Sequence, residues 1–315
     1  MSTAVIMLAL GLVLTVKGGD LFVDAAVWFA ESLGIPKFLI GATVVSLATT
    51  LPELAVSLQA TARGSDGIAA GNAIGSVCAN LGLILGITLC LTPTGLDRRD
   101  QGLKLAWMLL AGALLFSLCV GGQLGPVGVA LMLGLCILHL WQSARAGREH
   151  LTSRGGRRAR LRAALLVGHA ARFISGTAGI AAGSRLLSDY GALLARLCGV
   201  PEGVIGATLV AVGTSLPELV TALTALSRRE GSLAIGNVVG ANIIDLTLIL
   251  PLCALTRGGS LPLPCQSLRL DMPFCLALCV IAVVPTLIHE RFRRWQGAAL
   301  LGVFGVYVAK VIGGI

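Results

Sequence analysis

Residues 48–54 read ATTLPEL and residues 71–86 read GNAIGSVCANLGLILG, and both stretches recur 165 positions later as GTSLPEL (213–219) and GNVVGANIIDLTLILP (236–251). The whole of Gly41–Gly86 aligns without a gap onto Gly206–Pro251 at this offset. Each copy places one glutamate, Glu53 or Glu218, directly after a proline in an otherwise apolar run. A charge at membrane depth is costly, and it is typical of a functional site.

The composition is that of a polytopic membrane protein. Hydrophobic residues make up 56% of the 315 positions and charged residues 12%, and the mean hydropathy is +0.89. Such a chain uses lipid as the solvent for most of its surface, which excludes a soluble globule. The first residues, MSTAVIMLALGLVLTV, lack the features of a signal peptide and are assigned to the first span. The nine cysteines form no CxxC pair, and we expect them to pack as small residues.

Ten apolar stretches are long enough to cross roughly 30 Å of hydrocarbon. They lie near residues 4–30, 36–61, 67–92, 103–121 and 124–142 and, after an Arg-rich gap, near 164–197, 201–226, 231–256, 270–288 and 295–313. The sixth is the least regular, because His169, Arg172 and Arg185 interrupt it. We therefore predict an all-α polytopic membrane protein, divided into residues 1–142, a basic cytoplasmic loop at 143–163 and residues 164–315.

The repeat also extends upstream of the motifs. Asp24 and Pro36 recur at the same offset as Asp189 and Pro201. Because each copy contains five spans, an odd number, the second copy must lie upside down in the membrane relative to the first. The expected fold is therefore two inverted-topology five-helix repeats, an arrangement in which transporters place their ion site near the midplane between the repeats.

Charges in the connections predict the orientation. With the N-terminus outside, the inward-facing connections hold 16 of the 24 Lys and Arg residues and the outward-facing segments hold five. The inward-facing set consists of Lys37, Arg98, Arg99, Lys104, seven arginines from Arg145 to Arg162, Arg228, Arg229, Arg291, Arg293 and Arg294. The positive-inside rule then predicts that both termini lie on the extracytoplasmic side of the cell membrane. His139 and His289 are expected at the interface.

The net charge of +9 does not indicate nucleic-acid binding. The Arg-rich loop is short, and it lacks interleaved aromatic residues or a recognisable binding module. Topology and the anionic headgroups of the bilayer account for the charge better.

Pro52 and Pro217 predict kinks in the second and seventh spans. Proline lacks an amide hydrogen and clashes with the carbonyl four residues back, which frees carbonyls around Ser46 to Thr49 and around Ala211 to Thr214. Free carbonyls at membrane depth are tolerated only where they face protein or a polar cavity. Hydroxyl groups also precede each glutamate, and they belong to Thr49, Thr50, Thr214 and Ser215. In one copy these hydroxyls could simply repair a kinked helix, but two copies with identical carboxylates favour an ion site.

The third and eighth spans contribute a second pair of polar groups. Asn80 and Asp245 occupy equivalent positions in apolar runs, and with Glu53 and Glu218 they predict a diamond of oxygen ligands. Oxygen ligands favour hard cations over zinc or copper. Two bidentate glutamates and two free carbonyls supply six oxygens, which suits calcium better than magnesium. No Lys or Arg in these spans neutralises the glutamates, so cations or protons must do so, and we hypothesise that Asp245 is protonated.

The doubled motifs resemble those of the cation/calcium antiporter superfamily, specifically the prokaryotic sodium/calcium exchangers, over nearly the whole chain. The resemblance implies that Glu53 and Glu218 are the central calcium ligands, helped by Thr49 and Thr214, and that Asn80 and Asp245 complete the diamond. It also implies flanking sodium sites lined by Ser76, Thr50 and Ser215. In that family several sodium ions displace one calcium while the first and sixth helices slide across the rest. Ala241 stands where the family pattern has serine, so we expect weaker sodium binding there.

The expected function is therefore a secondary antiporter that exchanges sodium for calcium by alternating access. It needs no cofactor, and its expected partners are small cations and the lipid bilayer, with no obligate protein partner. Calcium/proton exchange and potassium-dependent exchange stay open as alternatives. An intramembrane enzyme is disfavoured, because such enzymes need paired aspartates or histidine zinc ligands. A passive channel or a scaffold does not require two inverted halves around costly polar groups.

Overall fold

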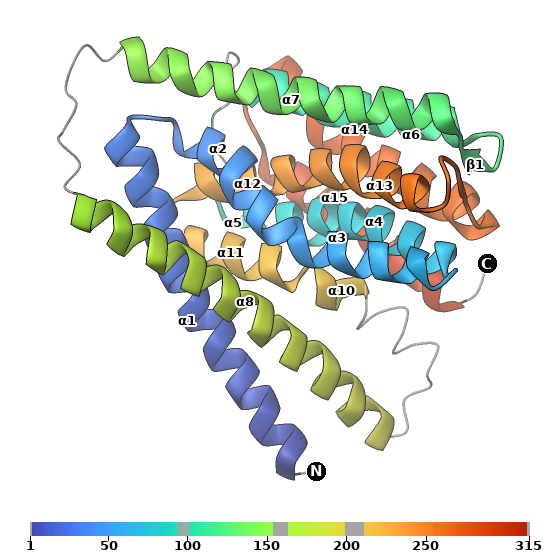
Figure 1. Ribbon diagram of the computed structural model, residues 1–315, viewed down its shortest axis with the longest axis horizontal. Helices are drawn as coiled ribbons and strands as arrows, with labels where there is room; N and C mark the ends of the chain where they lie inside the picture. The colour runs from blue at the N-terminus through green and yellow to red at the C-terminus, as the bar shows by residue number, and fades with distance from the viewer. Residues whose placement is uncertain (1, 93–94, 96–100, 154–162, 199–210, 314–315) are drawn as a thin grey trace.

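A computed structural model describes residues 2–92, 95, 101–153, 163–198 and 211–313. Most of its helices run nearly horizontally in Figure 1, and the long pair α1 and α8 crosses them diagonally. Within the described residues, eight helices are long and apolar enough to cross a membrane, and two shorter apolar helices accompany them. The all-helical polytopic fold predicted from the sequence is confirmed in this respect.

The elements follow the chain in two series. The first contains α1 (Ser2–Leu33), α2 (Lys37–Ile40), η1 (Gly41–Val45), α3 (Ser46–Ala62), α4 (Asp66–Ala79), η2 (Asn80–Leu85), α5 (Gly86–Leu91), α6 (Leu103–Cys119), β1 (Gln123–Leu124) and α7 (Pro126–Ser153). The second contains α8 (Ala163–Leu197), α10 (Ala211–Thr214), α11 (Leu216–Ser227), α12 (Gly231–Ile244), η5 (Asp245–Ile249), α13 (Leu250–Thr256), β2 (Leu261–Pro262), η6 (Ser267–Asp271), α14 (Met272–His289) and α15 (Arg294–Gly313). The η elements are π-helical segments.

Element bounds recur at the offset of the sequence repeat. Helix α12 begins and ends 165 residues after α4 (231 against 66, and 244 against 79). The π-helical segments η2 and η5 begin at the equivalent residues Asn80 and Asp245. A π-helical turn holds an extra residue and so redirects the side chains that follow, and such turns are frequent at functional sites. The same local irregularity therefore occurs in both copies at a predicted site residue.

Ion pairs show which helix ends share a face of the bundle. Lys37, at the start of α2, contacts Glu230, which follows α11, with Nζ–Oε1 at 2.6 Å. Asp66, at the start of α4, contacts Arg257, which follows α13, with Oδ2–Nη2 at 2.9 Å. The helix that begins at residue 37 and α11 therefore run in opposite directions, as do the continuous helices 66–91 and 231–256.

The helix bounds differ from the prediction in one respect. Helix α7 continues to Ser153, beyond the predicted end at residue 142, so the first part of the predicted loop 143–163 is helical. An exposed ion pair between Arg145 and Glu149, one turn apart at 3.1 Å, supports a helix that extends past its apolar part. Residues 154–162 and 199–210, with the start of the predicted span 201–226, lie outside the described residues.

One small feature was not expected. β1 and β2 form a two-residue antiparallel ladder between connections of the two series, which adds a minimal strand pairing to an otherwise helical fold. Helix α8 agrees with the predicted span 164–197 and is continuous despite the polar residues that interrupt its sequence pattern. One of them, His169, stacks on Trp28 of α1 with ring centroids 4.0 Å apart, so an aromatic partner accommodates it.

Lys104 and His139 are buried against neighbouring helices, which the sequence did not indicate. Lys104 was assigned to an inward-facing connection and His139 to the interface, but Lys104 is buried within α6 and His139 is fully buried on α7. Lys104 Nζ donates hydrogen bonds to the His139 carbonyl at 3.3 Å and to the Ser143 hydroxyl. These interactions between α6 and α7 satisfy a buried ammonium group that would otherwise be unstable.

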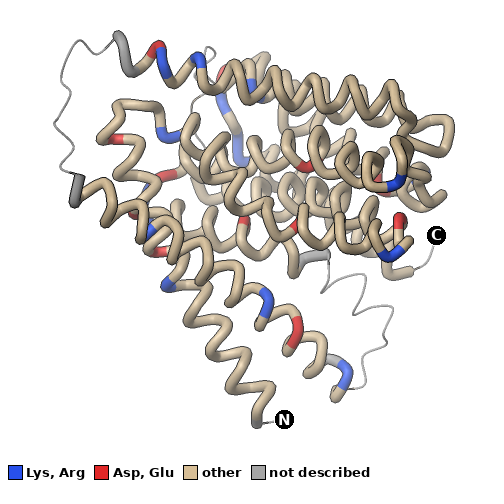
Figure 2. Tube along the Cα trace, viewed as in Figure 1, with Lys and Arg blue, Asp and Glu red and all other residues tan. Residues whose placement is uncertain are grey.

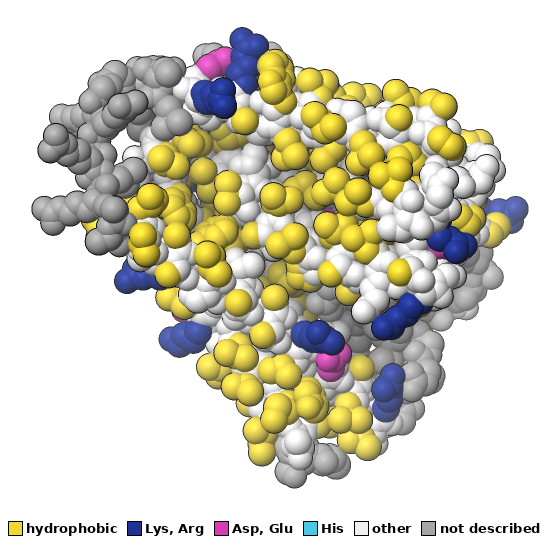
Figure 3. All heavy atoms as spheres, viewed as in Figure 1, with side chains coloured by type: hydrophobic (Ala, Val, Ile, Leu, Met, Phe, Trp, Pro, Cys, Tyr) yellow, Lys and Arg dark blue, Asp and Glu magenta, His cyan; other side chains and the backbone are white. Residues whose placement is uncertain are grey.

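The surface is apolar where lipid is expected. Large side chains such as Val127, Ile174 and Ile288 are exposed, and hydrophobic atoms cover much of the face in Figure 3. Most Lys and Arg residues lie toward the two ends of the horizontally drawn helices or along α1 and α8, whereas Asp and Glu also occur in the middle of the bundle (Figure 2). The few charges at that depth are therefore predominantly acidic.

Glycines bring α1 and α8 into backbone contact. A Cβ atom on Gly18 would lie 2.7 Å from the Ile180 nitrogen, and one on Gly176 would lie 2.8 Å from the Gly18 oxygen. Small residues at helix interfaces permit such close packing in lipid. The rings of Phe22 and Phe173, 4.5 Å apart, add an aromatic contact between the same helices. We therefore regard α1 and α8 as one packed unit, the α1–α8 pair.

Candidate ion site

The two repeated glutamates converge in the middle of the bundle. Glu53 lies on α3 and Glu218 in the first turn of α11, and each is about 1% exposed. Their carboxyl groups interact directly with each other. Neither oxygen of Glu53 has a hydrogen-bond partner, and neither has Oε2 of Glu218. Because ionised carboxylates only accept hydrogen bonds, two that face each other need a proton or a cation between them.

The two copies hold their glutamates on different backbones. Helix α3 runs unbroken through Pro52, whereas the second copy is interrupted at Ser215, between α10 and α11. Pro217 then lies near the start of α11, where proline suits the first helical turn. Glu218 therefore lies near the positive end of the α11 dipole, which favours a negative charge. The kink predicted for both copies is a helix break in the second copy only.

Hydroxyl groups cover one of the predicted carbonyl ligands. The Ser46 carbonyl accepts a hydrogen bond from the Thr50 hydroxyl at 2.5 Å, and the Thr49 hydroxyl, whose single proton can be donated either to this carbonyl or to Asn237, lies 3.3 Å away. This is the repair of a proline-containing helix that the sequence left open as an alternative. The Ser46 carbonyl can bind a cation only if these hydroxyls turn away. Ser46 Oγ in turn donates to the Thr43 carbonyl at 3.1 Å.

Thr49 lies between the two copies. Its hydroxyl interacts with the Glu218 carboxylate and also reaches Asn237 Oδ1 at 3.2 Å. A hydroxyl has one proton to donate and two lone pairs, so Thr49 can bond to one acceptor and still offer oxygen to a cation. Thr49 therefore lies beside Glu218, and its role as an ion ligand stays a prediction.

Four of the remaining predicted residues are buried and hold polar atoms without a hydrogen-bond partner. Asn80 and Asp245 are each about 1% exposed, and both amide atoms of Asn80 and Oδ1 of Asp245 have no hydrogen-bond partner. The hydroxyls of Ser76 and Ser215 are also buried and unpartnered. Thr214 is half-buried at the end of α10, and Ala211 begins that helix, although its side chain is outside the described part. Buried polar atoms are nearly always satisfied, so these side chains, which lack a partner within the protein, are suited to hold ions or water.

The acidic groups do not form a three-carboxylate site. Within the described residues, no three His, Cys, Asp or Glu side chains come together as a metal site. Asp245 interacts electrostatically with Glu53 and Glu218 at longer range. A cation between the two glutamates must therefore draw its other ligands from neutral oxygens, as hard cations commonly do.

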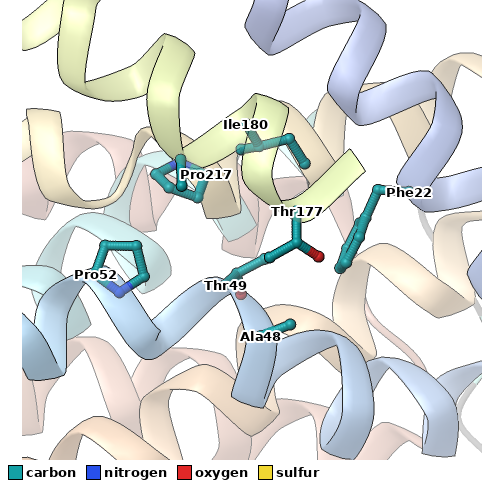
Figure 4. Close-up of a pocket in the computed structure, with 8 residues that line it drawn as sticks. Phe22, Ala48, Thr49, Pro52, Thr177, Ile180 and Pro217 are labelled. Carbon is teal, nitrogen blue, oxygen red and sulfur yellow. The ribbon is translucent and has the colours of Figure 1, made fainter. Parts of the chain in front are cut away.

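A small cavity lies beside the site and beneath the α1–α8 pair (Figure 4). Thr49 and Pro52 of α3 and Pro217 of α11 form one side, and Phe22 of α1 and Ile180 of α8 form part of the other. Ala48, Thr177 and Ala181 complete the lining. Both motif prolines and a candidate ligand therefore face the helix pair, which covers the site with mainly apolar side chains.

Two asparagines of the repeated GN pair support the site and were not among the predicted ligands. Asn72 Nδ2 donates to the Glu53 carbonyl at 3.1 Å and to the Ser57 hydroxyl at 2.8 Å. Its counterpart Asn237 accepts the hydrogen bond from Thr49. Their recurrence in both copies was a signal for them, but only the fold shows which groups they contact.

Comparison with known proteins identifies the family. The family described as sodium/calcium exchanger protein matches residues 3–143 and 168–313. The chain belongs to the sodium/calcium exchanger family. The resemblance noted in the sequence is thus confirmed, and the chain is a multi-pass membrane protein of this family.

Relatives of this exchanger-family chain match over almost its full length. The sodium/calcium exchanger MaX1 of Methanosarcina acetivorans is 33% identical, over 94% of this chain and 95% of the relative. The inner membrane protein YrbG of Escherichia coli is also 33% identical, over 99% of this chain and 97% of the relative. A solved structure of the sodium-calcium exchanger NCX_Mj superposes with a TM-score of 0.86 at 29% identity, over 97% of this chain and 98% of that one. The exchangers among these neighbours are transporters, consistent with the prediction that the chain is not an enzyme.

Proposed function

We propose that this protein is a secondary antiporter that exchanges sodium for calcium, with the ions bound in the middle of the membrane between Glu53 and Glu218. One observation carries the proposal: equivalent carboxylates from the two copies meet in the interior, and the described structure gives them no cationic side-chain partner. Such a pair is strongly unfavourable unless cations or protons neutralise it. The exchanger names of a relative and of a solved structure support the choice of ions.

The proposed architecture is two inverted five-helix repeats. Three observations support it: the recurring element bounds, the equivalent π-helical segments, and the antiparallel course of equivalent helices. The repeats correspond to residues 1–142 and 164–315, joined by the basic segment 143–163. We place both termini on the extracytoplasmic side of the cell membrane, because that orientation puts most Lys and Arg residues on the cytoplasmic side.

The chemistry of the ligands supports calcium as the divalent ion. Glu53 and Glu218 supply up to four carboxylate oxygens, Thr49 lies beside Glu218, and Thr214 is a further candidate for a neutral ligand by the family resemblance. Calcium accepts such a flexible set of six to eight oxygens, whereas magnesium requires a strict octahedron. Asn80 and Asp245 would extend the site, and Ser76, Thr50 and Ser215 would serve sodium ions beside it. The protonation of Asp245 stays a prediction.

Alternating access would follow from movement of the α1–α8 pair. The pair packs tightly within itself and covers the cavity that reaches Thr49 and both prolines. Inverted-repeat transporters expose a fixed site by moving one bundle against the other. Sliding of this pair across the core would therefore open the site first to one side and then to the other.

Flux measurements with purified protein in liposomes test the function. Vesicles loaded with sodium and diluted into sodium-free medium with radioactive calcium should accumulate calcium at equal pH on both sides, with a protonophore present. Glu53→Gln liposomes, reconstituted in parallel, provide the baseline. Absence of sodium-driven calcium uptake by the wild-type protein would refute the proposal.

Two variations of this assay separate the alternative couplings. Calcium movement that responds only to a pH gradient would identify calcium/proton exchange, which two facing carboxyl groups could also perform. Uptake that requires potassium on the calcium side would identify potassium-dependent exchange. The proposed function predicts full uptake without either condition.

A further inference from the structure

Ion pairs tie α1 to the turn between α11 and α12. Arg228, the residue that follows α11, donates from Nη2 to Asp20 Oδ1 at 2.9 Å and also pairs through Nη1 with Asp24. Asp20 and Asp24 lie one turn apart, so both carboxylates face the same guanidinium. These residues lie outside the ion site. The α1–α8 pair is therefore held to the core at the face that carries the α11–α12 turn.

The first copy contains the same two groups at equivalent positions. Arg63 directly follows α3 as Arg228 follows α11, with φ and ψ of −90° and 5° against −93° and 7°. Asp189 on α8 is the equivalent of Asp24 on α1. The α3–α4 turn lies at the opposite face, because Asp66 pairs with Arg257 at the far end of the helix 231–256. The components of a matching ion pair are thus present at the other face.

That second pair is not formed here. Asp189 Oδ2 lies 3.8 Å from Arg185 Nε on its own helix, and both side chains are mostly exposed. No ion pair joins Arg63 to Asp189, although the structure describes both. Two copies with the same components therefore differ in whether the contact is made.

Inverted repeats supply a reason for this difference. In such a transporter the opposite-facing state arises when the two halves exchange their local conformations. A contact made by one half in one state is then made by the other half in the alternate state. Because α1 and α8 pack as one unit, release of α1 at one face and capture of α8 at the other would be one movement.

We propose that Asp24–Arg228 and Asp189–Arg63 are alternate ion pairs, each formed in one of the two facing states, which position the α1–α8 pair over the ion site. The proposal rests on the proposed function for its inverted repeats and its alternating access. The four residues are positioning residues that touch no transported ion. The pairs are unequal, since Arg185 stands where α1 has Asp20 and competes with Arg63 for Asp189. This asymmetry favours the state with Arg228 bound.

Hydrogen–deuterium exchange of the purified protein without transported ions tests the proposal independently of transport. Arg228→Gln should raise deuterium uptake at the α11–α12 turn and lower it at the α3–α4 turn, whereas Arg63→Gln should do the reverse. Loss of a partly exposed ion pair of this kind should change the ratio of the two facing states by about 1.5- to 5-fold. The double variant should return toward the wild-type pattern. Arg229→Gln, a neighbouring exposed arginine, is the matched control.

A variant that strengthens the second ion pair provides a second test. Arg185→Asp recreates on α8 the paired acids of α1. It should therefore shift deuterium exchange in the same direction as Arg228→Gln while leaving the Arg228 contact intact.

Transport measured separately at each face of the membrane gives a further test, because apparent ion affinity at one face scales with the population of the state open to it. Arg228→Gln should therefore change the calcium KM in opposite directions at the two faces.

Two results would refute the alternate ion pairs, and a third would refute only the proposed ion coupling. Equal effects of Arg228→Gln and Arg229→Gln, or increased exchange at both turns in both single variants, would indicate ordinary local stabilisation and refute the proposal. A wild-type protein that lacks sodium-driven transport but shows the opposite-signed exchange shifts would refute the proposed ion coupling and leave the alternate ion pairs standing.

Discussion

Thr49 donates a hydrogen bond to Asn237 across the boundary between the two sequence copies, with Oγ1 and Oδ1 3.2 Å apart. Thr49 precedes the glutamate of the first copy by one turn, and Asn237 belongs to the GN pair of the second. The same threonine hydroxyl interacts with the Glu218 carboxylate. The ligand environment of one copy therefore depends on a residue of the other.

Asn237→Ala should weaken ion binding by removing the acceptor that orients Thr49. A hydrogen bond of this kind contributes about 0.5–1.5 kcal/mol, which corresponds to roughly a 2- to 10-fold increase in the calcium Kd. Isothermal titration calorimetry measures the change. Asn242→Ala is the control, since Asn242 lies on the same helix and its Nδ2 donates a hydrogen bond to Met108 Sδ, at 3.6 Å, and not to a candidate ligand. Equal effects of the two substitutions would contradict a specific role for Asn237.

Glu53→Gln and Glu218→Gln should each abolish calcium transport, with a loss of roughly 100-fold or more, because the ion loses a buried charged ligand. The same substitutions should stabilise the ion-free protein. Without bound ions, each substitution removes a repulsive buried charge, so the Tm should rise. The increase in Tm that calcium produces in the wild-type protein should be lost. A calcium-dependent Tm shift of wild-type size in either variant would exclude that glutamate as a ligand.

Ala241→Ser should strengthen sodium binding if the hydroxyl missing from this chain normally serves a sodium site. The sodium concentration for half-maximal calcium exchange should then fall. Ala234→Ser introduces the same hydroxyl at another buried position of α12 and should leave the sodium dependence unchanged. An unaltered sodium curve in Ala241→Ser would show that this departure from the family pattern has no effect on coupling.

Gly18→Ala should loosen the α1–α8 pair and impair transport. Its Cβ would lie 2.7 Å from the Ile180 backbone nitrogen and 2.9 Å from the Gly176 oxygen, so the helices must separate. Overpacking of this kind typically costs about 1–3 kcal/mol. Thermal denaturation and calcium uptake measure the two effects. Gly168→Ala, where the added Cβ meets nothing within 4 Å, should be nearly neutral. Normal uptake by Gly18→Ala would argue against a tightly packed moving pair.

Much of the fold was predictable because lipid imposes strong constraints on sequence. Spans such as 66–91 and 231–256 lie within one residue of their predicted bounds, since apolar length alone defines where a helix can cross hydrocarbon. The end of α7 was not predictable in this way, because its last turns extend beyond the apolar part and depend on local ion pairs such as Arg145–Glu149. The burial of Lys104 and His139 was not predictable for a related reason: hydropathy does not reveal a polar partner on a neighbouring helix.

The candidate site also combines features that the sequence indicated with features that only the structure reveals. Glu53, Glu218, Asn80 and Asp245 were recognisable from sequence because unneutralised polar groups at membrane depth are rare and these recur at one offset. Sequence could not show that hydroxyls cover the Ser46 carbonyl, or that the second copy breaks at Ser215 while the first runs on through Pro52. Equivalent motifs gain different surroundings because each copy packs against different neighbours.

The sequence by itself therefore determined the membrane class, the repeated helices and the identities of the unneutralised polar residues, since all three follow from the cost of placing polar groups in hydrocarbon. Only the tertiary structure decided which of those residues face each other, which of their atoms find partners, and where α1 is bound to the core. These properties depend on contacts between segments far apart in the chain, and such contacts are set by the packing of the whole bundle.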